Sequence, residues 1–215
     1  MAKKKANNQS NTGGSWTMKK YSIIYADPPW SYRDRRKGYG GAKDHYPTMK
    51  VDDICNLPIQ KITAENAALF LWVTFPNLLE GLKVMNSWGF KYKTLGFSWI
   101  KINKRSKTPV FGMGYYTKSN CEVCLLGIKG RMKPISNKVS SVIITPREEH
   151  SKKPDIVREK IVELFGDLPR IELFARQPTP GWDVWGNEVQ SDIILCPKRS
   201  GTQSCSRWDT GFLCI

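Results

Sequence analysis

Long apolar runs, histidine and acidic residues are all scarce in this sequence. No stretch of about 18 apolar residues is present, which excludes a transmembrane helix, and the N-terminus does not have the pattern of a secretory signal. We therefore expect a cytoplasmic protein with no membrane partner. The chain has 19 Asp and Glu against 34 Lys and Arg, which gives a net charge of +15.

The cysteine and histidine content argues against a disulfide framework and against a metal site. The six cysteines show no framework spacing, which is typical of a reducing compartment. Only Cys121 and Cys124 have the separation of a metal-binding pair, and a tetrahedral zinc site needs four ligands. The two histidines, His45 and His150, belong to other motifs, so we expect no metal.

Length and charge predict one basic domain. The 215 residues, 40% of them hydrophobic, suffice for a single α/β core. A charge of +15 favours a polyanion such as nucleic acid, although some basic proteins are merely soluble. We expect a disordered basic arm over residues 1–16, a globular domain over 17–190 and a C-terminal tail of unknown role over 191–215.

An apolar, β-prone run over residues 21–26 ends abruptly at Asp27-Pro28-Pro29-Trp30. Its composition is typical of a buried strand, and prolines cannot continue a sheet ladder because they lack an N–H. The strand therefore ends at Asp27 and delivers a loop.

The atoms at this strand end suit an amine substrate. Asp27 supplies carboxylate oxygens, and we expect the Pro28 carbonyl to point outward with no neighbouring N–H to bind it. Two acceptors can hold both hydrogens of an exocyclic amine, such as that of adenine, and free its lone pair. Trp30 and Tyr32 offer faces on which a flipped base could stack. The alternative is a plain strand followed by a proline turn.

Further motifs follow the strand end in a fixed order, and together they resemble one family. Asp27-Pro28-Pro29-Trp30 is similar to the catalytic motif of amino-group methyltransferases of the MT-A type, named after the seventy-kilodalton subunit of messenger-RNA adenosine methyltransferase. The resemblance covers about residues 21–190 and extends to His45-Tyr46-Pro47-Thr48-Met49, Gly112-x-Gly114-Tyr115 with Glu122, Gly127-Ile128-Lys129-Gly130, His150-Ser151-Lys152-Lys153-Pro154, Glu172-Leu173-Phe174-Ala175-Arg176 and Gly181-Trp182-Asp183-Val184-Trp185-Gly186-Asn187.

The resemblance implies a fold, a cofactor and site residues. The fold is a Rossmann-like α/β methyltransferase, a mostly parallel sheet with helices on both faces and the catalytic motif before the cofactor motifs. The cofactor is S-adenosylmethionine. The catalytic residues are Asp27, Pro28, Pro29 and Trp30; the cofactor contacts are Ala26, Asp27, Ser151, Lys153, Phe174, Arg176, Asn187 and Glu188; and the substrate contacts are Tyr32, Arg35, Arg36, Tyr46, Lys104, Tyr115 and Glu122.

The remaining pattern predicts the elements around this site. Thr48 is expected to cap a short helix over 51–56, and Pro76 to open a helix whose inner face carries Leu78, Leu79, Leu82 and Met85. A third helix over 154–165 is expected to bury Ile156, Val157, Ile161, Leu164 and Phe165. Strands are expected over 67–74, 94–101, 121–129, 142–145 and 170–175, and basic loops over 32–46 and 103–118.

We expect a methyltransferase acting on adenine in DNA, in the bacterial or phage branch of the family, working in the cytoplasm of a bacterium or a phage-infected cell. The compact chain, with no added RNA-binding domain, favours DNA. An RNA adenosine methyltransferase and a catalytically inactive nucleic-acid-binding subunit are the alternatives. Nucleic acid is the expected partner, and pairing with a second copy or with a paralogue stays open.

Overall fold

A computed structural model describes residues 19–31, 48–112, 116–147 and 152–195. Its centre is a seven-stranded sheet in the order β5-β3-β4-β2-β1-β6-β7. The strands are β1 Tyr21–Ala26, β2 Thr63–Val73, β3 Lys91–Ile102, β4 Cys121–Lys129, β5 Val142–Pro146, β6 Arg170–Leu173 and β7 Asp183–Trp185. The helices are α1 Val51–Cys55, α2 Leu78–Ser87 and α3 Ile156–Phe165, with short 3-10 turns at Ile59–Lys61 and Phe75–Asn77.

The sheet is mostly parallel, as expected. β1 pairs in parallel with both β2 and β6, β6 with β7, and β3 with β5. Only β4 among the named strands runs the other way, between β2 and β3. The carboxyl ends of the other six strands therefore lie at one rim of the sheet.

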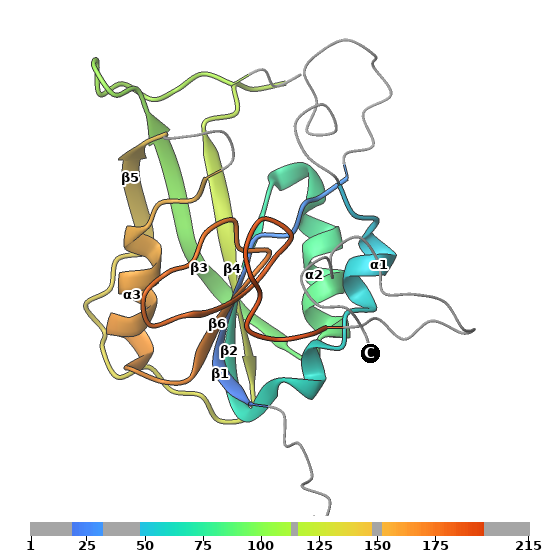
Figure 1. Cartoon of the computed structure of the whole chain (residues 1–215). Helices are drawn as coiled ribbons and strands as arrows, with labels where there is room; N and C mark the ends of the chain where they lie inside the picture. Colours follow the sequence, from blue (N-terminus) through green and yellow to red (C-terminus); the bar gives the residue numbers. More distant parts are fainter. Residues whose placement is uncertain (1–18, 32–47, 113–115, 148–151, 196–215) are drawn as a thin grey trace, which may run out of the picture.

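Helices cover both faces of the sheet (Figure 1). On one face Ile24 of β1 and Leu69 of β2 belong to a buried cluster with Val84 and Met85 of α2. On the other face Tyr25 of β1 belongs to a second cluster with residues of α3. Alternate strand residues point to opposite faces, so one apolar run supplies both cores.

Helix α3 is tied to the sheet by a buried ion pair. Arg158 donates from Nε to Oε2 of Glu172 on β6 at 2.7 Å and from a terminal nitrogen to Oε1 at 2.8 Å. The Arg158 guanidinium also lies over the Tyr25 ring, 5.6 Å from its centroid. Because two parallel hydrogen bonds fix both groups, the pair sets the position of α3 relative to the end of β1.

Several local expectations were wrong. Helix α1 is preceded by Lys50 in the cap position rather than Thr48, and no side chain caps it. Leu79 is 76% exposed because it lies about 100° around the helix from Leu78, away from the buried stripe of α2. Ile156 is likewise exposed, on the outer side of the first turn of α3.

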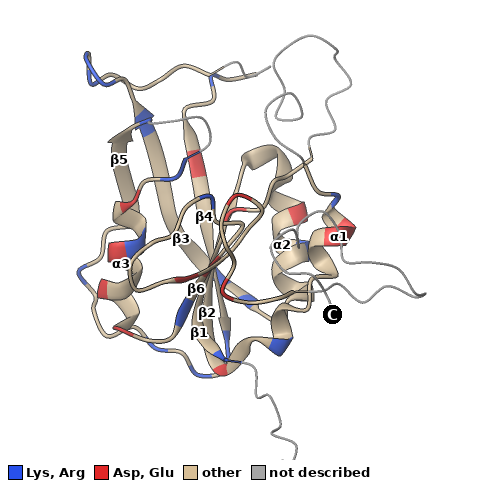
Figure 2. Ribbon diagram, viewed as in Figure 1, with Lys and Arg blue, Asp and Glu red and all other residues tan. Residues whose placement is uncertain are grey.

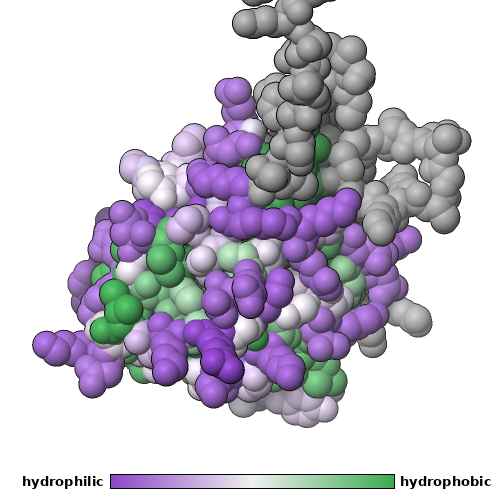
Figure 3. Space-filling model, turned by 90° about the horizontal axis from the view of Figure 1, so that it is seen from below, coloured by the Kyte–Doolittle hydropathy of each residue, from purple (hydrophilic) through white to green (hydrophobic). Residues whose placement is uncertain are grey.

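The lower end of the molecule is largely hydrophilic (Figure 3). In the view from below, hydrophilic side chains cover most of the surface and hydrophobic patches are separate (Figure 3). The segment after β7 packs onto the core, because Leu195 is buried and the Asp192 backbone N–H donates to the Val184 carbonyl at 2.9 Å. No helix of the described segments is long and apolar enough to span a membrane.

Candidate active site

Asp27 lies at the topological switch point of the sheet, where the order in which strands are added reverses. It follows β1, which has β2 on one side and β6 on the other. The chain leaves β1 toward β2 and returns to its other side only with β6, so the strand order reverses here. Such a switch point opens a crevice beyond the carboxyl ends of the strands, where ligands of open α/β sheets bind.

Asp27 belongs to a cluster of four charged side chains. Lys153 Nζ lies 2.6 Å from Asp27 Oδ2 and 3.2 Å from Glu122 Oε2. Lys101 of β3 forms a hydrogen bond with the other oxygen of Glu122. The Asp27, Glu122 and Lys153 side chains are 29%, 18% and 10% exposed, so the cluster is largely withdrawn from water. Two ammonium groups thus balance two carboxylates.

The partly buried setting changes the proton affinities of the cluster. Burial raises the pKa of Asp27 above its ordinary value, although the Lys153 ammonium opposes this. Burial acts in the same sense on Glu122, but Lys153 and Lys101 together outweigh it and lower its pKa. Burial would lower the pKa of Lys153, yet Asp27 and Glu122 raise it. Lys153 is therefore a permanent cation beside Asp27.

Trp72 of β2 connects three parts of this site. Its indole N–H donates to the Tyr25 hydroxyl at 2.7 Å, and its carbonyl accepts the indole N–H of Trp30 at 3.0 Å. Lys153 Nζ lies over its ring, 5.6 Å from the centroid. Trp72 therefore contacts β1, the proline loop and Lys153, and it fixes their positions relative to one another.

Two expectations for the proline loop need correction. The Pro28 carbonyl is not left without a neighbouring N–H, because it accepts the Trp30 backbone N–H at 2.9 Å. One lone pair of that oxygen remains for a ligand. Trp30 is only 5% exposed and lies in the core, so its ring offers no free face for a base in this structure. A bond from the Met49 N–H to the Pro29 carbonyl, 2.9 Å long, further fixes the loop.

The segments after β6 and β7 lie side by side at the same rim. The Ala175 N–H donates to the Trp185 carbonyl at 3.0 Å. A Cβ on Gly186 would lie 2.0 Å from the Ala175 carbonyl oxygen, so only glycine permits this approach. Phe174 has a φ of 62°, which is uncommon and strained for a bulky residue. Strain of this kind often marks a ligand site.

Three predicted cofactor residues come together in these segments. Arg176 Nε lies 3.2 Å from Glu188 Oε2, and Asn187 precedes Glu188 on the surface. Ala26 is fully buried at the end of β1. The roles proposed for these residues, and for Lys153, stay predictions.

The predicted substrate residues are placed less completely. Glu122 lies in the Asp27 cluster, and Lys104 lies at the exposed tip of the hairpin after β3. The other predicted substrate residues fall outside the described residues, namely Tyr32, Arg35, Arg36, Tyr46 and Tyr115, and so does the predicted cofactor residue Ser151.

Sequence reasoning missed Lys101 and Trp72. The alternation of β3 gives a signal for Lys101, because it shares a face with the buried Trp99 two residues earlier. Trp72 gave no signal beyond its apolar strand. Among the described residues, no group of three or more His, Cys, Asp or Glu could hold a metal ion.

The mostly parallel sheet, with its switch point at Asp27 and helices on both faces, is a Rossmann-like α/β fold. The MT-A70 family model matches residues 21–188, so the chain belongs to the MT-A70 family. The resemblance inferred from the motifs is thereby confirmed. So is the expectation of an enzyme that methylates adenine.

Similar proteins come from several kinds of organism. The chain is 35% identical to "Type II methyltransferase M.MunI" of Mycoplasma sp over 198 residues, which is 83% of this chain and 82% of that protein. It is 28% identical to the human "N(6)-adenosine-methyltransferase catalytic subunit METTL3" over 182 residues, 83% of this chain but 30% of METTL3. It is also 28% identical to "N6-methyladenosine RNA methyltransferase MTA1" of Pyricularia oryzae, covering 86% of this chain and 52% of that protein. The chain thus spans most of M.MunI and less than a third of METTL3.

Proposed function

We propose that this chain transfers the methyl group of S-adenosylmethionine to the exocyclic amine of adenine in DNA. The observation that carries the proposal is the Asp27 carboxylate at the switch point, 2.6 Å from a permanent cation. The choice of DNA is supported by M.MunI, a type II methyltransferase that this chain matches over 82% of its length.

Asp27 is suited to hold the reacting amine. Its free oxygen can accept one amine N–H, and the remaining lone pair of the Pro28 carbonyl can accept the other. Lys153 binds the other oxygen, Oδ2, at 2.6 Å, and this bond restrains the orientation of the carboxylate. Because burial raises the pKa of Asp27, its carboxylate is a better proton acceptor than an exposed aspartate and can take the proton that the amine loses.

The rim also fits the cofactor. When bound, S-adenosylmethionine supplies an electrophilic methyl group on a sulfonium. Its amino-acid portion carries one positive and one negative group, which the Asp27, Glu122 and Lys153 cluster can match. The ribose hydroxyls suit Asn187 and the Arg176–Glu188 pair, which Gly186 brings close to the end of β6. The rim therefore offers charged partners for the amino-acid portion and hydrogen-bonding partners for the ribose, which supports the proposed cofactor.

The test is a comparison of matched substrates. The protein is incubated with S-adenosylmethionine labelled in its methyl group and with DNA and RNA of the same sequence, each single-stranded and duplex, and the modified nucleoside is identified. Label in N6-methyldeoxyadenosine supports the proposal. Label only in RNA establishes the RNA alternative, and cofactor binding without transfer to any substrate indicates an inactive nucleic-acid-binding subunit.

The proposal extends to the setting of the enzyme. A DNA-modifying enzyme of this kind would work in the cytoplasm of a bacterium or a phage-infected cell. A homodimer and a pairing with a paralogue are distinguished from a monomer by light scattering of the protein alone and with DNA.

A further inference from the structure

A basic hairpin, which we call the β3 finger (residues 101–112), continues β3 beyond the body of the sheet. It carries Lys101, Lys104, Arg105 and Lys107 and no acidic residue. Lys101 is paired with Glu122 at the base of the finger, whereas the other three cations are exposed and form no ion pair with any described residue. Lys and Arg mark the tip of this hairpin at the upper left of Figure 2.

The finger is an ordered ribbon rather than a loose loop. The Asn103 N–H donates to the Thr108 carbonyl at 2.8 Å, the Lys107 N–H donates to the Asn103 carbonyl at 3.1 Å, and the Val110 N–H donates to the Lys101 carbonyl at 2.8 Å. The Asn103 side-chain amide adds a bond to Thr108 Oγ1 at 3.2 Å. Lys107 closes the turn with a φ of 58°, a left-handed conformation that costs energy for a residue with a side chain.

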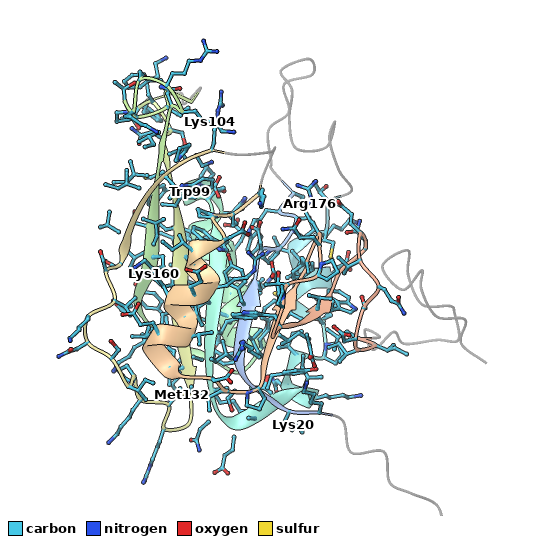
Figure 4. All side chains as sticks on the ribbon, turned by 60° about the vertical axis from the view of Figure 1, so that its left-hand side comes forward. Lys20, Trp99, Lys104, Met132, Lys160 and Arg176 are labelled. Carbon is cyan, nitrogen blue, oxygen red and sulfur yellow. The ribbon has the colours of Figure 1, made fainter. Side chains whose placement is uncertain are left out.

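The finger rises from the same rim as Asp27. β3 runs in the direction of β1, because β4 is antiparallel to both β3 and β2 and β2 is parallel to β1. Pairing across the sheet places Phe97 level with Trp72, one residue beyond the level of Ala26. From Phe97 to Lys104 the ribbon extends roughly 23 Å at ~3.3 Å per residue, and it stands roughly 14 Å to the side of β1, three strand spacings away. Figure 4 shows Lys104 projecting beyond the end of the molecule that carries Arg176.

A protruding two-stranded ribbon suits one kind of nucleic acid. The major groove of B-form DNA is about 12 Å wide and 8.5 Å deep and admits a two-stranded β-ribbon. The major groove of an A-form RNA duplex is too deep and narrow for side chains to read. A single strand has no groove that a rigid protruding ribbon could enter.

On the basis of the proposed function, we infer that the β3 finger enters the major groove of duplex DNA beside the adenine that is flipped toward Asp27. Lys104 and Lys107 contact phosphates on the groove walls, and Arg105 lies between them at the tip, where it can reach base edges. The substrate is therefore B-form duplex DNA. The base is extruded from it, and the finger holds the remaining helix at the rim.

The test measures the affinity of the full chain for a duplex that the wild type methylates, which serves as the target, and for the corresponding single strand, from low to moderate salt. The variant Lys104→Ala/Lys107→Ala removes two phosphate contacts, so the slope of log affinity against log salt on duplex DNA falls by about 1.8, from ~0.9 for each contact. Lys160→Ala on α3, a cation away from the rim (Figure 4), is the matched control and keeps the wild-type slope. Arg105→Ala relaxes the preference for target over non-target duplex by tenfold or more.

Three results would overturn the inference. One is an unchanged duplex slope in the double variant. A second is an equal fall on duplex and single strand, which would make the finger a general polyanion contact. A third is a change of the double variant from dimer to monomer in light scattering, which would make the finger a protein interface. If one of these results is found but the wild-type protein methylates adenine in single-stranded DNA, the inference about the finger fails and the proposed function stands. If the wild-type protein methylates no substrate, the proposed function itself is refuted.

Discussion

Replacing Lys153 with Met removes the central cation of the active-site cluster while keeping most of its volume. Asp27 and Glu122 then face each other as carboxylates with Lys101 as the remaining cation. Breaking a buried pair in this way costs ~3–5 kcal/mol of unfolding free energy. Because the two carboxylates keep some contact with water, we expect the lower end, about 3 kcal/mol, or a melting temperature lower by about 6–12 °C for a chain of this size.

The same change alters the pH dependence of methyl transfer. Lys153 opposes the effect of burial on Asp27, so its removal raises the Asp27 pKa further and moves the acidic limb of the rate profile to higher pH. The Lys153 pKa is itself raised above its unfolded value of 10.5, so its contribution to stability is complete at neutral pH and is lost only as the pH rises through the folded value. The stability of the Lys153→Met variant is therefore compared with that of the wild type at pH 7, where the contribution of Lys153 is complete.

Thermal unfolding and rate profiles from pH 5 to 9 measure both effects. Lys83→Met is the control, because Lys83 and Asp52 are 2.7 Å apart but 61% and 79% exposed, and an exposed pair contributes little. A Lys153→Met variant that melts with the wild type and keeps its acidic limb would refute the assigned role of the cluster.

Two further variants test Glu122 and Trp30. The lowered pKa of Glu122 contributes stability that is present above its ordinary value of 4.5 and is lost as the pH falls, so Glu122→Gln should be less stable than the wild type at pH 7 by a margin that shrinks toward pH 4. Denaturant unfolding at several pH values would disprove this by showing a constant margin. Trp30→Ala opens a cavity in the core and should cost ~3–5 kcal/mol in the same assay. A loss below about 1 kcal/mol would mean that the Trp30 ring is not a core residue.

Local signals predicted the catalytic strand end well. Two prolines after an apolar run locate the end of β1 at Ala26, because each lacks the N–H that a sheet ladder requires. β4 was predicted with the bounds that the structure has, Cys121–Lys129. The order of the motifs predicted the family and hence the sheet.

Contacts between distant residues could not be predicted from local pattern. Lys153 and Asp27 are 126 residues apart, and only the assembled rim brings them within 2.6 Å. Trp30 follows the prolines, where an exposed aromatic is plausible, but its indole N–H finds the Trp72 carbonyl in the core. Leu79 was misjudged because it and Leu78 are adjacent and cannot share one face of α2, whose buried residues are Gly81, Val84 and Met85.

The measurement that tests the central claim most directly is single-turnover methylation by Asp27→Asn, with the modified nucleoside identified. The amide keeps the shape of Asp27 but replaces a charged acceptor of the adenine N–H by a neutral group. A polar contact made in the transition state is worth about 100- to 1,000-fold in rate. We predict a loss of that size in the formation of N6-methyldeoxyadenosine by a folded protein, measured at saturating S-adenosylmethionine so that weaker cofactor binding does not contribute. A near-wild-type rate with this folded variant would contradict the assignment of Asp27 as the group that holds the reacting amine.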